Sequence, residues 1–154
     1  MKNGLNYLLA ISLFISFSAC VSPSGNEKNS TTKNDNVVAK NIIFMIGDGM
    51  SYAQIQGTET ALKKRLVMSS MPVTGNITTY SADKLITDSG AGGTALATGQ
   101  KTNNGMIGMR ADSTVVESLL EIFADAGKRT GLVVSCGITH ATPASFVAKD
   151  ISRS

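Results

Sequence analysis

The chain has 154 residues, of which 42% are hydrophobic and 16% are charged, enough for one compact domain around a single core. Its 14 basic and 11 acidic residues give a formal charge of +3, and no segment gathers the basic ones into a long stripe, which argues against nucleic-acid binding. Two cysteines, Cys20 and Cys136, are too few for a disulfide framework, and a single histidine, His140, cannot complete a zinc site that needs several imidazoles.

Residues 1–19 are typical of an export signal, because Lys2 precedes a short apolar run at 7–17 that ends in small residues. The run is shorter than the roughly 20 residues that a membrane-spanning helix needs. The letters FSAC at 17–20 resemble a bacterial lipobox, which implies that Cys20 is acylated and becomes the mature N-terminus. The alternative is an ordinary cleaved signal with an incidental cysteine. The lipobox interpretation predicts an exported protein, lipid-anchored at the periplasmic face of a membrane or at the cell surface.

Residues 20–36 are expected to form a disordered tether between this anchor and a folded domain. After Val21 the segment is made of Ser, Thr, Asn, Lys, Pro, Gly, Glu and Asp. Such a composition cannot bury enough apolar surface to offset the entropy lost on ordering. The folded domain is therefore expected to occupy residues 37–154.

The first half of this domain alternates between strand and helix patterns. A run of branched apolar residues ends at Gly47-Asp48-Gly49, as a strand buried in a parallel sheet would. A small-residue segment without proline suits a closely packed helix. In chain order, the expected elements are a strand at 41–46 preceded by Val37-Val38, a helix at 51–65, a strand at 73–80 and a helix at 89–98.

The second half continues the alternation. The clearest helix is expected at 114–126, where Thr114 and Glu117 suit a capping box and Gly127 ends the helix. The remaining expected elements are a strand at 130–135 and a helix with Thr142 at its N-cap and Pro143 at its first position. The succession of strands and helices predicts an α/β fold with a parallel sheet.

Two chemistry-bearing segments fall where α/β proteins collect ligands, at strand ends and helix starts. Asp48 stands between two glycines directly after a strand, so its carboxylate can bind a cation, although a turn aspartate without a ligand is the alternative. Ser89 opens a helix, whose positive end favours a phosphate or an alkoxide. The glycines that follow Ser89 can equally serve close helix packing.

A third segment holds His140, Thr142 and Arg153. Each has a structural interpretation as well: a hydrogen-bonded histidine, a helix N-cap and a solvated arginine. Beside an oxyanion, however, a guanidinium is the best bidentate partner. The importance of Arg153 therefore depends on an oxyanion being bound nearby.

In their order and spacing, the three segments together resemble the alkaline phosphatase family. The stretches that carry the resemblance are IIFMIGDGM, GNITTYSADKLITDSGAGGTALATGQKTNNGMIGM and THATPASFVAKDISR, within 41–153. The resemblance implies a doubly wound, mostly parallel α/β sheet sandwich, incomplete here at its C-terminus. It also implies hydrolysis of phosphate monoesters through a phosphoserine intermediate, with two zinc ions and one magnesium ion.

Carried over residue by residue, the resemblance implies that Ser89 is the nucleophile and a zinc ligand, and that Arg153 binds the phosphate. It implies that Asp48 bridges the same zinc and the magnesium, and that Thr142 binds the magnesium. His140 matches a further position at the magnesium site. Coordination to a metal makes a serine hydroxyl nucleophilic without a histidine base, which agrees with these roles.

The family's remaining metal ligands, three histidines among them, lie in a later portion of its members. The chain is therefore expected to be the N-terminal part of an enzyme that can be a homodimer at full length, and to have little or no activity alone. Two alternatives stay open: a related metal-dependent phosphodiesterase or sulfatase, and a non-catalytic lipoprotein fragment that keeps the scaffold.

Overall fold

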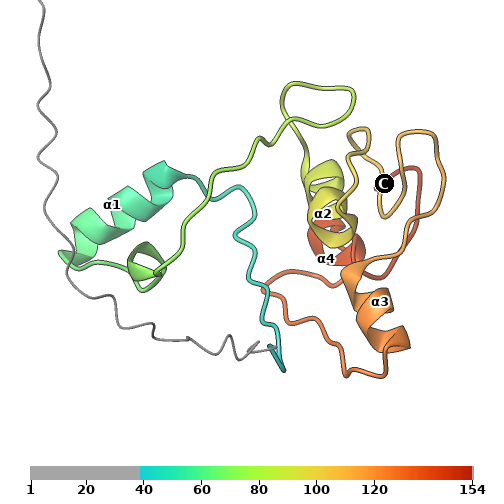
Figure 1. Ribbon diagram of the computed structural model, residues 1–154. Coiled ribbons are helices and arrows are strands. Elements are labelled where there is room, and N and C mark those ends of the chain that lie inside the picture. The colour runs from blue at the N-terminus through green and yellow to red at the C-terminus, as the bar shows by residue number, and fades with distance from the viewer. Residues whose placement is uncertain (1–38, 154) are drawn as a thin grey trace, which may run out of the picture. The chain divides into compact units, whose positions relative to one another are not determined.

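The computed structural model describes residues 39–153, so the expected export signal, Cys20, the tether and Val37-Val38 lie outside the described residues. The chain divides into two units, Met1–Ile42 and Ile43–Ser154, and all described helices belong to the second. They are α1 (Tyr52–Leu62), a short 3-10 helix η1 (Met68–Ser70), α2 (Ser89–Thr98), α3 (Leu119–Asp125) and α4 (Ala141–Ala144) (Figure 1).

Helix α2 confirms the helix predicted at 89–98, with the same bounds. Asp88 caps its N-terminus, because the carboxylate Oδ1 accepts a hydrogen bond from the Ala91 N–H at 2.9 Å. Gly99 ends the helix in the left-handed conformation, with φ at 71°, and its N–H donates to the Ala95 carbonyl. Glycine suits this position because a Cβ would strain the backbone there.

Small residues let α2 pack closely against α4, and α2 also contacts α3 (Figure 1). A Cβ on Gly93 would lie 2.8 Å from Ser145 Oγ and 3.2 Å from Thr142 Cα, so glycine is required at the crossing. Thr94 and Ser145 are fully buried, and each hydroxyl has a hydrogen-bond partner. The buried apolar residues are Ala91, Ala97, Met106, Ile107, Ala141 and Phe146.

The helix expected at 114–126 is shorter than predicted. An antiparallel hairpin occupies 109–115 and takes up the first residues of the expected helix. The Thr114 hydroxyl donates to Asp112 Oδ1 at 2.7 Å, inside the hairpin. The predicted capping box of Thr114 with Glu117 is therefore wrong.

The capping box instead joins Ser118 and Glu121, at the start of α3. The Glu121 carboxylate accepts from the Ser118 N–H at 2.7 Å and from Lys149 Nζ at 2.6 Å. The buried Ser118 hydroxyl donates to the Phe146 carbonyl at 2.7 Å. These bonds tie α3 to the segment that follows α4.

The Glu121 contacts predict how stability depends on pH. Burial would raise the pKa of Glu121, but the hydrogen bonds from Lys149 and Ser118 outweigh it and lower the pKa below its usual value. A lowered pKa in the folded state contributes stability above the ordinary glutamate pKa, and this contribution is lost as pH falls through the lowered value. We expect Glu121→Gln to make the free energy of unfolding, measured in urea, depend less on pH in the acid range. Glu117→Gln keeps the Glu121 contacts and should therefore keep the pH dependence that they cause.

The segments expected as strands at 41–46, 73–80 and 130–135 are neither helical nor paired as strands within residues 39–153. A strand needs a neighbour for its N–H and C=O groups, and no such neighbour lies alongside these segments in that part of the chain. Their side chains are accordingly exposed, with Ile43 at 88% and Val133 at 102%. The predicted parallel sheet is therefore not formed by the described residues, whose bridges are antiparallel and isolated.

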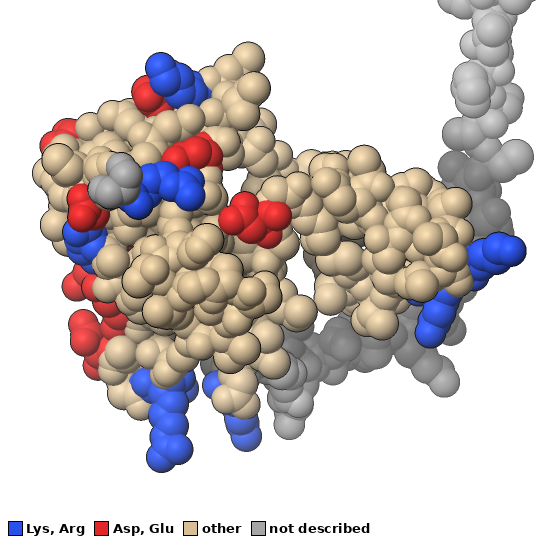
Figure 2. Space-filling view, turned by 180° about the vertical axis from the view of Figure 1, so that it is seen from behind, with Lys and Arg blue, Asp and Glu red and all other residues tan. Residues whose placement is uncertain are grey.

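On the face that Figure 2 shows, basic and acidic side chains are mixed at the left, and further basic side chains project at the bottom and at the right-hand edge. Among the described residues, no helix combines the length and the apolar character needed to span a bilayer.

Candidate active site

Ser89 is the first residue of α2, and its hydroxyl meets the side chain of Arg153. The Arg153 Nη1 donates to Ser89 Oγ at 2.7 Å and to Asp88 Oδ2 at 3.3 Å. Ser89 is half-buried. The helix N-terminus and the guanidinium both place positive charge at this oxygen, which favours an anion there.

Asp88 holds this arrangement as an anion. Burial would raise the pKa of Asp88, but hydrogen bonds from the Ala91 and Gly105 N–H groups and from Arg153 outweigh it and lower the pKa. The Gly105 N–H donates to Asp88 Oδ2 at 3.0 Å. Asp88 therefore stays charged at neutral pH and orients the guanidinium rather than exchanging protons with it.

An antiparallel backbone bridge between Ile107 and Asp150 places Arg153 near Ser89. The Ile107 N–H donates to the Asp150 carbonyl at 2.8 Å, and the Asp150 N–H donates back to the Ile107 carbonyl at 2.9 Å. This antiparallel bridge holds the chain beside the segment that follows α2, and Arg153 lies three residues beyond it. The position of Arg153 thus depends on the backbone around residue 107.

Asp48 and Thr142 form a second pair, 94 residues apart in sequence. The Thr142 hydroxyl donates to Asp48 Oδ2 at 2.8 Å. Asp48 lies in a turn that the Met50 N–H closes on the Gly47 carbonyl at 3.1 Å, with Gly49 at a φ of 66°. The glycines on either side therefore serve the turn that presents the carboxylate.

The predicted N-cap role of Thr142 is wrong. Helix α4 begins at Ala141, so His140 occupies the N-cap and Pro143 the third helical position. Thr142 lies inside the first turn, which leaves its hydroxyl available for Asp48.

The packing of α2 on α4 connects the two pairs. Thr142 Cα lies against Gly93, which is one helical turn after Ser89. The structure thus brings Ser89 of α2 together with Arg153, and Thr142 of α4 together with Asp48, and α2 and α4 are in close contact.

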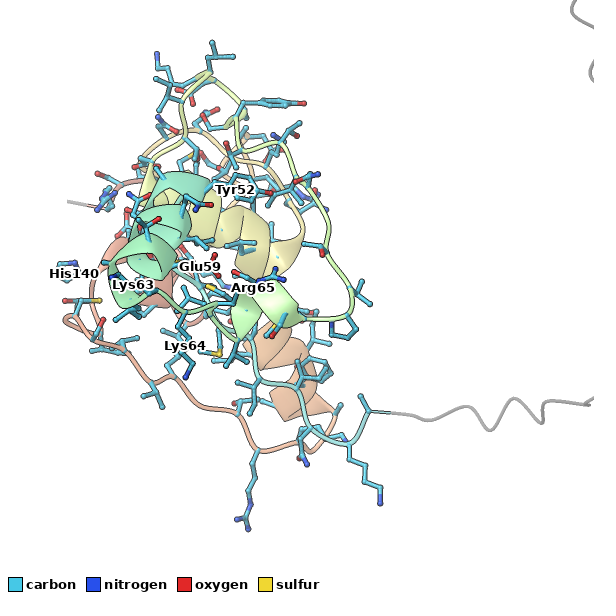
Figure 3. All side chains as sticks on the ribbon, turned by 90° about the vertical axis from the view of Figure 1, so that its left-hand side faces the viewer. Tyr52, Glu59, Lys63, Lys64, Arg65 and His140 are labelled. Atoms are coloured by element: carbon cyan, nitrogen blue, oxygen red, sulfur yellow. The ribbon has the colours of Figure 1, made fainter. Side chains whose placement is uncertain are left out.

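His140 does not join either pair within residues 39–153. Its imidazole is exposed, projects at the left-hand margin of Figure 3, and forms no hydrogen bond with the described residues. The ring lies against Gly137, where an added Cβ would be 3.3 Å from the Cδ2 atom of the imidazole. The structure therefore shows no hydrogen bond from the His140 imidazole to Asp48 or Thr142, and the place of His140 at a magnesium site stays a prediction.

The donors of the second pair fit magnesium better than zinc. A carboxylate and a hydroxyl oxygen, as in Asp48 and Thr142, are the hard ligands that magnesium prefers. Zinc takes four ligands, commonly with nitrogen or sulfur among them, and no group of three or more His, Cys, Asp or Glu suited to a metal occurs among the described residues. Those residues therefore do not make a zinc site.

A pocket of about 310 Å³ borders the Arg153 side chain. Its wall is mainly apolar and is formed by α4, by residues before and after α4, and by Ile107. Its lining residues are Ile107, Ile138, Thr139, Ala141, Ala144, Val147, Ala148, Asp150, Ser152 and Arg153. The organic part of a ligand held by Arg153 can extend toward it.

Comparisons with known proteins agree on one family. The family model described as alkaline phosphatase matches residues 39–154. Alkaline phosphatase 4 of Bacillus subtilis is 41% identical over 136 residues, which cover 82% of this chain and 30% of that protein.

The solved structures agree with the family match. An alkaline phosphatase from the Antarctic bacterium TAB5 superposes with a TM-score of 0.66 and 40% identity, over 69% of this chain and 31% of that one. A point mutant of the same enzyme, with Mg bound in its M3 site, has the same TM-score of 0.66 and 40% identity, over 69% and 31% of the two chains. The chain thus spans about a third of the length of these relatives.

Proposed function

The chain belongs to the alkaline phosphatase family, and from this premise we propose that residues 39–154 carry the nucleophile and the phosphate-binding arginine of a phosphate-monoester hydrolase. The observation that carries the proposal is the 2.7 Å hydrogen bond from Arg153 Nη1 to Ser89 Oγ at the N-terminus of α2. A serine oxygen and a guanidinium at this distance suit attack on phosphorus and binding of the phosphoryl oxygens.

In the proposed reaction, Ser89 Oγ attacks the phosphorus of the ester as its own proton passes to solvent. The Oγ–P bond forms, the bond from phosphorus to the alcohol oxygen breaks, and the alcohol leaves with a proton. Water then attacks the phosphoserine and releases inorganic phosphate. Arg153 binds the phosphoryl oxygens throughout, and Asp88 keeps the guanidinium oriented.

We propose that Asp48 and Thr142 hold a magnesium ion, which supplies positive charge beside the transferred group when it is bound. A zinc ion held in part by Asp48 and Ser89 requires ligands beyond those of the described residues. The hydrogen bond that the Thr142 hydroxyl donates to Asp48 supports the magnesium proposal, because it brings together two oxygen atoms that can bind a metal.

The segments 41–46 and 130–135, which have strand composition, support a proposal about a parallel sheet. We propose that 41–46 and 130–135 are strands of a doubly wound, mostly parallel sheet when neighbouring strands are present. Their exposed branched side chains are typical of strands that are buried on both faces. We also propose that the protein is exported and held by a lipid on Cys20, on the basis of the FSAC motif.

A side-by-side substrate assay tests the proposed reaction. We propose that this chain is the N-terminal part of a longer enzyme, called the full gene product below, because it spans about a third of the length of its relatives. Supplied with zinc and magnesium, the full gene product is expected to hydrolyse 4-nitrophenyl phosphate with a kcat/KM at least about 100-fold above those for bis(4-nitrophenyl) phosphate and 4-nitrophenyl sulfate, because differential transition-state binding sets specificity. The 154-residue chain by itself is expected to show little or no hydrolysis. A preference for the diester or the sulfate would contradict the proposal.

A further inference from the structure

A turn at 103–106 lies against the segment that leads into Ser89. The Met106 N–H donates to the Asn103 carbonyl at 3.2 Å and closes the turn. Gly105 has a φ of 91°, a conformation that the turn requires and that glycine adopts without strain. The turn therefore presents the backbone and the side chain of Asn104 in a defined direction.

The Asn104 carboxamide binds two backbone groups in the segment before the nucleophile. Its Oδ1 accepts from the Asp88 N–H at 3.1 Å, and its Nδ2 donates to the Ile86 carbonyl at 3.0 Å. The Asn104 N–H also donates to Asp83 Oδ1 at 2.8 Å. A carboxamide has both a donor and an acceptor, so it can bind an N–H and a C=O at once.

The same turn also controls the side chain of Asp88. The Gly105 N–H donates to Asp88 Oδ2, which accepts from Arg153 Nη1 as well. The turn thus contacts the Asp88 backbone through Asn104 and the Asp88 carboxylate through Gly105. Asp88 directly precedes Ser89 and is hydrogen-bonded to Arg153, so a displacement of Asp88 moves both site residues.

We infer that Asn104 is a positioning residue that fixes the Asp88 backbone, and thereby the alignment of Ser89 with Arg153. The inference rests on the proposed function, because alignment matters only if Ser89 attacks a phosphoryl group bound by Arg153. Asn104 itself touches neither Ser89 nor Arg153. Misplacement of reacting groups by about 1 Å can cost on the order of 100-fold in rate, so a positioning residue can have a measurable effect.

Two variants and a matched control test the inference. Asn104→Ala removes both carboxamide bonds, while Asn104→Asp keeps an acceptor for the Asp88 N–H. Asn103→Ala makes the same truncation one residue earlier, where the side chain donates only to the Ala111 carbonyl at 3.4 Å. Amide hydrogen exchange is measured on the 154-residue chain, and kcat and KM are measured on the full gene product.

In Asn104→Ala, we expect the Asp88 amide to exchange about tenfold faster and kcat to fall about tenfold, while the Ala97 amide stays as protected as in the parent. Asn104→Asp should keep Asp88 exchange within about threefold of the parent, and Asn103→Ala should change neither quantity by more than about twofold.

The inference is overturned if Asp88 exchange is unchanged in Asn104→Ala, or if kcat is unchanged although exchange is faster. Equal acceleration at Asp88 and Ala97 also overturns it, because the residue would then support the whole helix. If the unsubstituted full gene product hydrolyses no phosphate monoester, the proposed function fails. The exchange data from the 154-residue chain still decide whether Asn104 fixes Asp88.

Discussion

Ser89→Ala is expected to reduce phosphate-monoester hydrolysis by the full gene product by on the order of 10⁴-fold or more. The variant lacks the oxygen that forms the bond to phosphorus, which is the hydroxyl oxygen that Arg153 Nη1 contacts at 2.7 Å. The helix itself should persist, because its N-cap is Asp88. The loss should therefore appear in kcat with an unchanged unfolding midpoint.

Peptide mapping after an acid quench measures the intermediate directly. The parent protein should carry phosphate on the peptide that contains Ser89, and Ser89→Ala should carry none. Ser70→Ala is the matched control, because the Ser70 hydroxyl is exposed and donates to the carbonyl of Val67, the N-cap residue of η1. Phosphate found on another serine, or trapped on the Ser89→Ala protein, would contradict the assignment.

The helices that could be predicted are those whose signals are local. Helix α2 was predictable in full because its cap, Asp88, and its terminator, Gly99, lie at its own ends. The start of α3 was predicted too early, because Thr114 and Ser118 are both followed by a glutamate three residues later. Only the hairpin at 109–115, a contact between neighbouring segments, decides between the two caps.

Strands are harder to predict than these helices, because their signals are not local. A run such as 41–46 has strand composition, but strand pairing depends on a neighbour that local sequence does not identify. In this part of the chain the run is neither helical nor paired as a strand, and one of its side chains has a packing partner: Phe44 contacts Phe146 edge-on, with ring centroids 6.3 Å apart. Composition thus predicted a sheet that the described residues do not form.

The site residues likewise divide into those that sequence motifs indicate and those that depend on contacts between segments. The structure places Ser89 beside Arg153 and Asp48 beside Thr142, and the catalytic and metal-binding roles that the family resemblance implies for them stay predictions. The sequence alone does not indicate the role of Asn104, because that role depends on a turn approaching a segment 16 residues earlier. An Asn-Gly pair in sequence indicates a turn, but it does not show what that turn contacts.

Gly108→Ala is expected to lower the free energy of unfolding of the 154-residue chain by about 3 kcal/mol or more. Gly108 has a φ of 59°, and a Cβ there would lie 2.3 Å from the Ala148 carbonyl oxygen and 2.8 Å from Lys149 Cδ. The Lys149 side chain can move aside, but the Ala148 carbonyl belongs to the backbone next to the bridge that joins Ile107 to Asp150. The variant must therefore open this bridge or distort the backbone.

Gly99→Ala separates the cost of the left-handed backbone conformation from the cost of the steric clash with the Ala148 carbonyl. Gly99 has a φ of 71°, but no atom lies within 4 Å of its Cβ position, so the variant should lose only the left-handed backbone term, about 1 kcal/mol in urea unfolding. Equal losses in the two variants would show that the Ala148 carbonyl yields freely. Because Arg153 follows the bridge by three residues, opening the bridge should also withdraw the guanidinium from Ser89. Gly108→Ala should therefore lower kcat/KM of the full gene product at temperatures where it is still folded, and Gly99→Ala should not.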